Sequence, residues 1–468
     1  MITLVIALTI HYAESNLMTR EVISLRKIKK RGKGMDYLYI DEKGPQETIR
    51  VSNPYNEDKK IKLGNDNMHV YVADVIKINK DSLSVIEENY KLLEKKYIAS
   101  RNFDKELKGK DILGRNFKFG IASMKDRELD FYNSLIGLLL ENQVDNLLLS
   151  INKMSLVADN RLTDWILELE KKRFIESAWL LKYSLVKYLE IEASASVILS
   201  IFDPNKSNRE VLTEIQKDLG AFIEKNKLIK RMKVQIKEYK GLIQTIKKNK
   251  HLISTSSFVE VSFDWEKLSF NIDLWMTEMS QNNKFNTQGT ELILDEGIPL
   301  QPFKKFDFLL VKEEEDSANH VGLRISDVLI VFMGKMISKL ANDVKYDKKK
   351  PEERKLLSNS WFALEEKQFE LLKKMKDYFF PYNSTYCFVV DAYFDDAALL
   401  QTYFEYVSTY ESFDSYKAQT KNHVENHFVH FTAVLHSKWA LAMRNEQVIR
   451  KIYGSMIGAI EAEVLRPL

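Results

Sequence analysis

Hydrophobic and polar positions follow two different periods along the first half of the chain. Residues 37–40 and 69–78 carry Tyr, Val, Ile and Leu in short runs that end in polar segments, a pattern typical of strands. Residues 81–98 and 126–141 space their apolar positions for one face of a helix. Strands interspersed with helices predict an α/β fold with a mixed sheet flanked by helices.

The same patterns place further elements along the chain. A long apolar helix is predicted over residues 328–340, and the chain after it is mostly helical, with one short strand-like run near the single cysteine. The other predicted strands are residues 48–51, 145–153, 290–297 and 306–312.

Changes in pattern divide the chain into three regions. Residues 1–34 are predicted to be an N-terminal extension, because their apolar start is too short to span a membrane and a basic run separates it from the first strand. Residues 35–340 form the predicted α/β domain, which a helical insertion interrupts at about 204–283. Residues 341–468 form a predicted C-terminal helical domain, a candidate surface for a homo-oligomer or a partner protein.

Positive charge is concentrated in the insertion. Between Lys225 and Lys250 there are ten Lys or Arg residues and a single acid, Glu238. A solvated helix face is the ordinary explanation of such a run, and an arm that contacts nucleic-acid phosphates is the alternative. The candidate phosphate contacts are Lys230, Arg231 and Lys233.

Composition limits the remaining chemistry. The 468 residues are 45% hydrophobic and carry a net charge of +3, so the balance of charge alone does not indicate nucleic acid. Cys387 is the single cysteine, which excludes an internal disulfide, argues against a thiolate zinc site and fits the reducing cytoplasm. No Gly-rich phosphate loop or Gly-x-Ser-x-Gly turn is present, which argues against ATP hydrolysis and serine hydrolase chemistry.

Two predicted strands end in a pair of acids with a glycine one or two residues later. Asp41-Glu42 follows the strand of residues 37–40, and Asp295-Glu296 ends the strand of residues 290–297. Asp327 is a third candidate, because it lies in the first turns of the long apolar helix. Carboxylates on rigid elements are suitable ligands for Mg²⁺ or Mn²⁺, although each pair also fits a polar turn.

Short motifs around these acids resemble the family called domain of unknown function 3800. The matching residues are Tyr39, Asp41, Glu42 and Gly44 in the opening motif, Glu106, Lys108 and Gly109 in the middle segment, Asp295 on the late strand, and Gly322, Leu323 and Asp327 in the closing motif. The resemblance covers roughly residues 35–340. It implies a ribonuclease-H-like fold, nuclease activity, and a role in defence against phage or in mobile elements.

The chain also departs from that family's pattern. Lys43 stands in place of a small hydroxyl residue, Arg324 in place of Gln, and Ser326 in place of Ala. These changes leave the acids in place and bear on the fine geometry and the number of metal ions.

The resemblance and the strand positions together suggest roles for the acids. Asp41 is expected to bridge the metal ions, and Glu106, Asp295 and Asp327 are expected to complete the catalytic set. Glu42 is a second choice as a metal ligand, since neighbouring strand residues point to opposite faces, and Glu296 is a second choice for the same reason.

Lys108 is expected to hold the scissile phosphate. Each of these residues has a simpler alternative. Glu106 and Lys108 fit an exposed strand, and Asp327 fits an ordinary acid at a helix N-terminus.

A histidine row near the C-terminus is a separate candidate. His423, His427 and His430 lie at i, i+4 and i+7 on one face of a predicted helix, a spacing that can bind Zn²⁺ or Ni²⁺. A polar or partly buried helix face is the alternative and the commoner arrangement.

Two functions of different classes follow from these patterns. The first is a metal-dependent nuclease that cuts DNA or RNA by two-metal hydrolysis. The second is a non-catalytic binding or sensing module on the same fold, within a defence or regulatory complex. Convergence of the acids in the folded chain is the feature that separates the two functions.

Overall fold

The structure is a computed structural model. It describes residues 36–43, 49–55, 61–62, 68–99, 107–113, 117–253, 261, 263, 265–282, 284–285, 289–306, 309–345, 347–381, 388–391 and 395–462. The predicted N-terminal extension, residues 1–34, lies outside these residues, and so do Gly44, Glu106 and Cys387.

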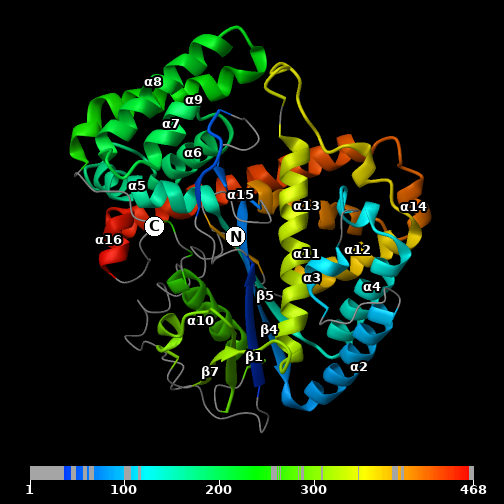
Figure 1. The fold of residues 1–468 in the computed structure, drawn as a ribbon. Coiled ribbons are helices and arrows are strands. Elements are labelled where there is room, and N and C mark those ends of the chain that lie inside the picture. Colours follow the sequence, from blue (N-terminus) through cyan, green and yellow to red (C-terminus); the bar gives the residue numbers. More distant parts are fainter. Residues whose placement is uncertain are drawn as a thin grey trace.

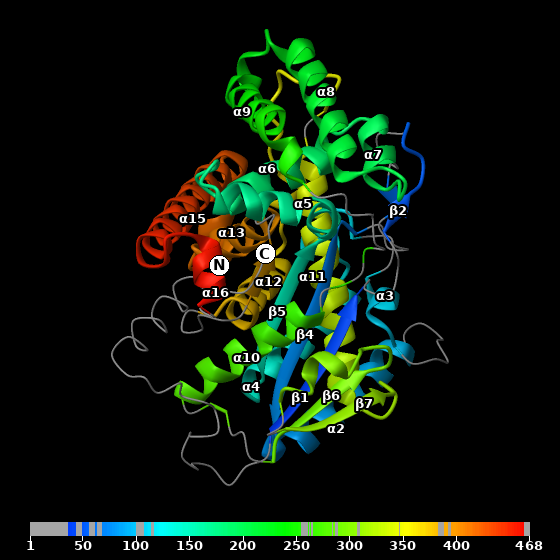
Figure 2. The ribbon, with the colours of Figure 1, turned by 90° about the vertical axis from the view of Figure 1, so that its left-hand side faces the viewer.

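A six-stranded mixed sheet organises the fold (Figures 1 and 2). Its strands lie in the order β7-β6-β1-β4-β5-β8. β4 is antiparallel to both β1 and β5, whereas β6 runs parallel to β1, β7 parallel to β6 and β8 parallel to β5. The bounds are β1 Asp36–Lys43, β4 Val70–Asn79, β5 Asp145–Asn152, β6 Glu291–Asp295, β7 Leu310–Glu315 and β8 Phe388–Asp391. The chain is therefore an α/β protein with an open mixed sheet.

Alternation along the strands assigns side chains to two apolar cores. In β1, Leu38 and Ile40 enter the core on one face of the sheet, and Tyr39 enters the core on the other. All residues of β4 from Val70 to Ile78 are buried, as expected for a central strand covered on both faces.

Helices on the Tyr39 face form the first core. The long helix α11 packs across β1 and β4 and lies along the length of the sheet (Figure 1). The helices on this face are α2 Lys80–Ala99, α3 Gly109–Ile112, α4 Asp126–Glu141, α11 Val321–Val344, α12 Glu366–Phe379 and α13 Asp395–Ser408.

Helices on the opposite face share the second core with Leu38 and Ile40. α7, α8 and α9 stand at one end of the molecule, and β7 and α2 lie toward the other end (Figures 1 and 2). The helices are α5 Lys153–Lys171, α6 Ala178–Ile191, α7 Ala195–Ile201, α8 Asn208–Asn226, α9 Lys233–Asn249 and α10 Trp265–Gln281. The insertion predicted at 204–283 therefore continues a helical layer that begins at Lys153 and packs on the sheet.

The C-terminal region, predicted as mostly helical with one short strand-like run, contains one described strand, β8, near that run. β8 extends the central sheet beside β5, and α12 and α13 contribute to the same core as α11. The remaining helices are α14 Phe413–Lys417, α15 His423–Tyr453 and α16 Met456–Glu461. This region completes the central fold because its apolar residues cover the α11 side of the sheet.

Two predicted boundaries differ from those in the structure. The strand expected at 306–312 is β7 at Leu310–Glu315, which includes most of an acidic run. β7 is an edge strand with exposed or half-buried side chains, so its acids require no burial. The helix expected at 328–340 begins at Val321, after His320 in an extended conformation. Gly322, Leu323 and Asp327 therefore all lie inside α11.

β2 (Arg50–Val51) pairs antiparallel with β3 (Ile61–Lys62) outside the main sheet. Within the described ranges, no helix combines the length and the apolar character needed to cross a membrane.

Candidate metal centre

Asp41 is the central side chain of the candidate site. It lies near the end of β1, on the face that α11 covers, and only 6% of it is exposed. Burial raises its pKa well above the ordinary value, and repulsion from Asp327, Glu42 and Asp295 raises it further. Asp41 is therefore part of the strand itself, and the reading as a polar turn is wrong.

Asp295 reaches the same place from the neighbouring strand. β6 runs parallel to β1 and ends at Asp295, after a shift in its register with β7. Ile40 pairs with Leu294, so the two acids that follow them lie next to each other on adjacent strands, and each affects the pKa of the other. Burial raises the pKa of Asp295, while the nearby charge of Lys108 lowers it. The two strand-end acids that the sequence singled out thus lie side by side.

Asp327 approaches from α11. It lies in the second turn of the helix, too far inside to act as an N-terminal cap. The backbone N–H of Gly109 donates to Oδ2 of Asp327 at 2.6 Å, which fixes the carboxylate. A Cβ atom on Gly109 would lie 2.8 Å from the backbone oxygen of Asp327 and 2.9 Å from the Cβ of Val331. Only glycine lets α3 come this close to α11.

A second glycine contact holds α11 against β1. A Cβ atom on Gly322 would lie 2.3 Å from ring atoms of Tyr39. The ring of Tyr39, which is two residues before Asp41 in β1, therefore packs directly on the backbone of α11 at Gly322. Four of the short motifs noted in the sequence meet here, through Tyr39 with Gly322, Asp41 with Asp295, and Gly109 with Asp327.

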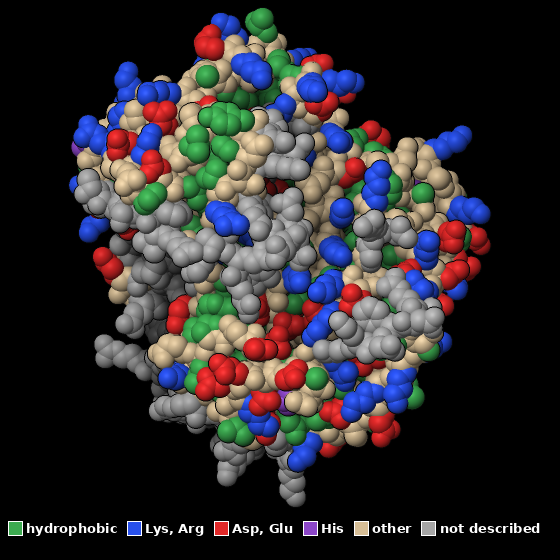
Figure 3. Space-filling model, in the orientation of Figure 1, with side chains coloured by type: hydrophobic (Ala, Val, Ile, Leu, Met, Phe, Trp, Pro, Cys, Tyr) green, Lys and Arg blue, Asp and Glu red, His purple; other side chains and the backbone are tan. Residues whose placement is uncertain are grey.

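Lys108 lies beside the acids, as predicted. Its ammonium donates to the hydroxyl of Ser317 at 2.8 Å, and its charge acts on Asp295. Lys108 precedes α3 in an extended conformation and is not part of a strand, so the alternative of an exposed strand pair is wrong. Figure 3 shows acidic side chains gathered near the middle of one face, with Lys and Arg side chains alongside.

Glu42 belongs to this group more closely than its position on the strand suggested. Burial raises its pKa to about 8, with a further contribution from Asp295. Its Oε2 atom is buried and has no hydrogen-bond partner among the described residues. Glu296, by contrast, lies exposed in the turn after β6. Asp41, Asp295, Asp327 and Glu42 offer the oxygen ligands that Mg²⁺ or Mn²⁺ requires.

Asp74 is a further acid beside the site that was not predicted from the sequence. It pairs directly with Asp41 across β1 and β4 and is fully buried. Its carboxylate accepts hydrogen bonds from Asn146 and from the hydroxyl of Ser326, the residue before Asp327. Burial raises its pKa to about 7, although these two hydrogen bonds lower it. The available signal was a single acid inside the otherwise apolar run of residues 70–76.

The three basic residues predicted to contact phosphate are not brought to the carboxylates. Glu106 lies outside the described residues. Lys230 and Arg231 lie in a short 3₁₀ turn (η3, Lys230–Met232), and Lys233 begins α9. The guanidinium of Arg231 donates to the backbone oxygen of Pro351 at 2.7 Å, beyond the C-terminal end of α11. The segment of α11 from Asp327 to that end spans roughly 25 Å at 1.5 Å per residue.

The carboxylates form a looser group than a compact metal shell. Within the described part of the chain, the only set of three metal-ligating side chains whose ligand atoms all lie within 4.8 Å of one another is His69, Glu190 and Asp396. A divalent ion shared by Asp41, Asp295 and Asp327 therefore requires their ligand oxygens to come closer together than they are in this structure.

The histidine row on α15 has a structural explanation. Tyr416 stacks on His423 at 4.0 Å between ring centroids, and the His423 Nδ1 atom is 2.9 Å from the hydroxyl of Tyr406. Burial lowers the pKa of His427 to about 3. These two rings pack among aromatic side chains, as expected for a partly buried helix face.

Comparison with known proteins adds no relative: no family model, no curated protein and no solved structure matches this chain.

Proposed function

We propose that this protein is a metal-dependent nuclease that hydrolyses phosphodiester bonds of DNA or RNA. The observation that carries the proposal is the meeting of Asp41, Asp295 and Asp327, which come from β1, β6 and α11. Asp41 is buried, Asp295 and Asp327 are half-buried beside it, and the pKa values of Asp41 and Asp295 are raised. Acids gathered in this way are costly for a fold and are characteristic of functional sites. Mg²⁺ or Mn²⁺ would stabilise the charged form of this cluster.

The strand order supports a ribonuclease-H-like core for this activity. β1, β4 and β5 form an antiparallel series, after which β6 and β7 pair parallel on the other side of β1. Asp41 and Asp295 lie on the adjacent strands at the centre of that arrangement. This order is the one expected of a ribonuclease-H-like sheet, with β8 as an additional edge strand.

The chain's own residues divide the work of hydrolysis. Asp41, Asp295 and Asp327 hold the cations, which when bound activate water and stabilise the leaving oxygen. Glu42 supplies a further carboxylate beside Asp295. Lys108 provides a positive charge for the substrate phosphate next to the acids. Gly109 keeps the Asp327 carboxylate in position through its N–H.

Cleavage of labelled single- and double-stranded DNA and RNA tests the proposal. Wild-type protein with Mn²⁺ or Mg²⁺ is compared with Asp41→Asn, which keeps the side chain's size and removes its charge. Asp164→Asn is the matched control, because Asp164 is an exposed aspartate on α5. We expect cleavage that requires the metal and is lost only in Asp41→Asn.

Cleavage that persists in Asp41→Asn would refute the assignment. If the wild type binds nucleic acid but cleaves none of the four substrates with either metal, the alternative of a non-catalytic binding or sensing module on the same fold is favoured.

A further inference from the structure

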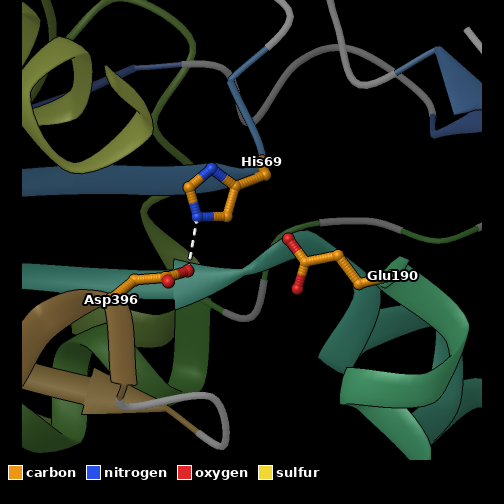
Figure 4. Close-up of side chains that lie close together, drawn as sticks. All are labelled: His69, Glu190 and Asp396. Atoms are coloured by element: carbon orange, nitrogen blue, oxygen red, sulfur yellow. Dashed lines mark hydrogen bonds and ion pairs between the residues drawn. The ribbon is translucent and has the colours of Figure 1, made fainter. Parts of the chain in front are cut away.

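A second group of metal-ligating side chains lies away from the carboxylate site. His69 immediately precedes β4, Glu190 is near the end of α6, and Asp396 is in the first turn of α13. Each offers one ligand atom, and these atoms all lie within 4.8 Å of one another. Figure 4 shows the three side chains pointing into one shared space from three separate elements.

The group is shielded from solvent and already partly oriented. Only 11% of the His69 side chain and 12% of the Asp396 side chain are exposed. The His69 Nε2 atom is 2.6 Å from Oδ2 of Asp396, and its Nδ1 atom is 3.4 Å from the hydroxyl of Ser338 on α11. The contact with Ser338 holds the ring so that Nε2 points at the carboxylate of Asp396. Such a partner on the other ring nitrogen is the usual support of a metal-bound histidine.

The third ligand is also fixed. The side-chain amide of Asn152, at the end of β5, donates to Oε2 of Glu190 at 3.3 Å. One imidazole and two carboxylates form a donor set that suits Zn²⁺ and related divalent transition metals. Two carboxylates and a single imidazole lie together where solvent is largely excluded. When both carboxylates are ionised, one imidazolium balances only one of them, and a bound cation would balance the other.

We propose that His69, Glu190 and Asp396 form a structural site for one divalent transition metal ion, with Zn²⁺ as the ion that fits the donor set best. Binding replaces the proton shared by His69 and Asp396 with the metal, and that proton is released to solvent. The ion would join the start of β4 in the central sheet to α6 of the helical layer and to α13 of the C-terminal region.

The proposed zinc site is distinct from the carboxylate site. His69 is five residues from Asp74 along β4, which corresponds to roughly 17 Å of strand. Loss of one site should therefore leave the other able to bind its ion.

Titration of the chelator-treated full-length protein with ZnCl₂ tests this proposal, by calorimetry and by thermal unfolding. The wild type is expected to bind one Zn²⁺ at this site and to unfold at a higher temperature with the metal. Glu190→Gln keeps the shape of the side chain and should weaken Zn²⁺ binding by more than about 100-fold, because it removes a ligand. Ser338→Ala should weaken it by roughly 10-fold, because it only frees the ring.

Two controls separate this site from others. His430→Gln removes a histidine that lies 3.7 Å from Glu405 on α13, outside any close group of three ligands in the described chain, and should bind Zn²⁺ as the wild type does. Asp41→Asn should do the same, so failure of the nuclease proposal does not affect this test.

Unfolding of each metal-free variant with EDTA present verifies that it is folded. Equal Zn²⁺ affinity and an equal thermal shift in folded Glu190→Gln and wild type would overturn the proposal. Absence of Zn²⁺ binding by the wild type would also overturn it.

Discussion

At the scale of residues, the raised pKa of buried Asp74 makes a prediction about stability. Its pKa is about 7 in the folded chain, against the ordinary 3.8 expected after unfolding. Between these values the folded state holds a proton that the unfolded state has lost, so the free energy of unfolding falls as pH rises from about 4 to about 7. Above about pH 7 Asp74 is ionised in both states, and its contribution to the free energy of unfolding no longer changes with pH. Glu190, with a pKa of about 7, and Glu42, with a pKa of about 8, add to the same trend.

Asp74→Asn should remove the Asp74 part of this slope. Urea unfolding at pH 5 and pH 8 with EDTA present measures it. We expect the wild type to lose more stability than Asp74→Asn between the two pH values. An identical loss in both proteins would show that the Asp74 carboxyl group is not held protonated by the fold.

Gly109 gives a second prediction at this scale. In Gly109→Ala the new methyl group meets the backbone of α11, so α3 must move and the hydrogen bond to Asp327 lengthens. Overpacking of this kind costs about 1–3 kcal/mol. We therefore expect a lower melting temperature and weaker Mn²⁺ binding.

Gly241→Ala on α9 is the matched control for that substitution, because nothing lies within 4 Å of the added atom. It should be neutral or slightly stabilising, since Ala favours helix more than Gly does. Equal effects of the two substitutions on Mn²⁺ binding would argue against a positioning role for Gly109.

Some of these residues could be predicted from the sequence and others could not. Asp41 and Asp295 stand out because each acid comes at the end of a strand pattern, and Gly109 was singled out only by the family resemblance. Asp74 did not stand out, because its place beside Asp41 depends on the pairing of β1 with β4. Strand register depends on contacts between segments, so it cannot be derived from the sequence of either segment alone.

At the scale of elements, α9 presents its charge on one side. Lys233, Lys237 and Lys240 are exposed, whereas Ile236 and Tyr239 are buried against the neighbouring helices. This arrangement fits both a solvated face and a phosphate-binding face, so a measurement is needed to separate them. The distance from the acids means that α9 would contact nucleic acid away from the cleaved bond.

Charge reversal of Lys233, Lys237 and Lys240 to Glu tests the phosphate-binding reading. If α9 contacts the nucleic-acid backbone, the variant should bind DNA or RNA more weakly and with a shallower salt dependence, by about 0.9 in the logarithmic slope for each lost contact with double-stranded DNA. Titrations at several salt concentrations measure both quantities.

Reversal of Lys91, Lys95 and Lys96 on α2 makes the same change of charge elsewhere on the molecule and is the control. If the two variants are affected equally, the basic run is an ordinary solvated face.

Element boundaries show where local patterns were insufficient. The apolar pattern placed the start of α11 at residue 328, but the helix begins at Val321 because Tyr39 and Gly322 pack there. That contact is between segments almost 300 residues apart in sequence and leaves no periodic signal. The acidic run in β7 is likewise typical of a loop by its composition. It can belong to a strand because β7 lies at the edge of the sheet.

At the scale of the whole molecule, the C-terminal region belongs to the central fold. β8 pairs with β5, and Leu372, Phe379, Leu400 and Phe404 lie in the core that α11 shares. The sequence showed the apolar content of these helices but not the surface that they cover, because that surface is formed by residues far away along the chain.

Truncation after residue 340 should therefore give an unstable or aggregating protein. Removal of α12 and α13 exposes the apolar side of α11 and the edge of β5. We expect the full chain to be folded by circular dichroism and by thermal unfolding, and the truncated chain to be neither cooperative nor soluble at the same concentration. A truncated chain with a sharp thermal transition would establish an independent N-terminal domain.

The central claim is that Asp41, Asp295 and Asp327 bind divalent cations together. Anomalous diffraction from crystals soaked in MnCl₂ tests it most directly, because it locates the ion without a chosen substrate. We expect Mn²⁺ density in contact with carboxylate oxygens of all three aspartates, and we expect that density to be absent from Asp41→Asn crystals. Ordered, well-resolved carboxylates without Mn²⁺ density at a saturating concentration would contradict the account.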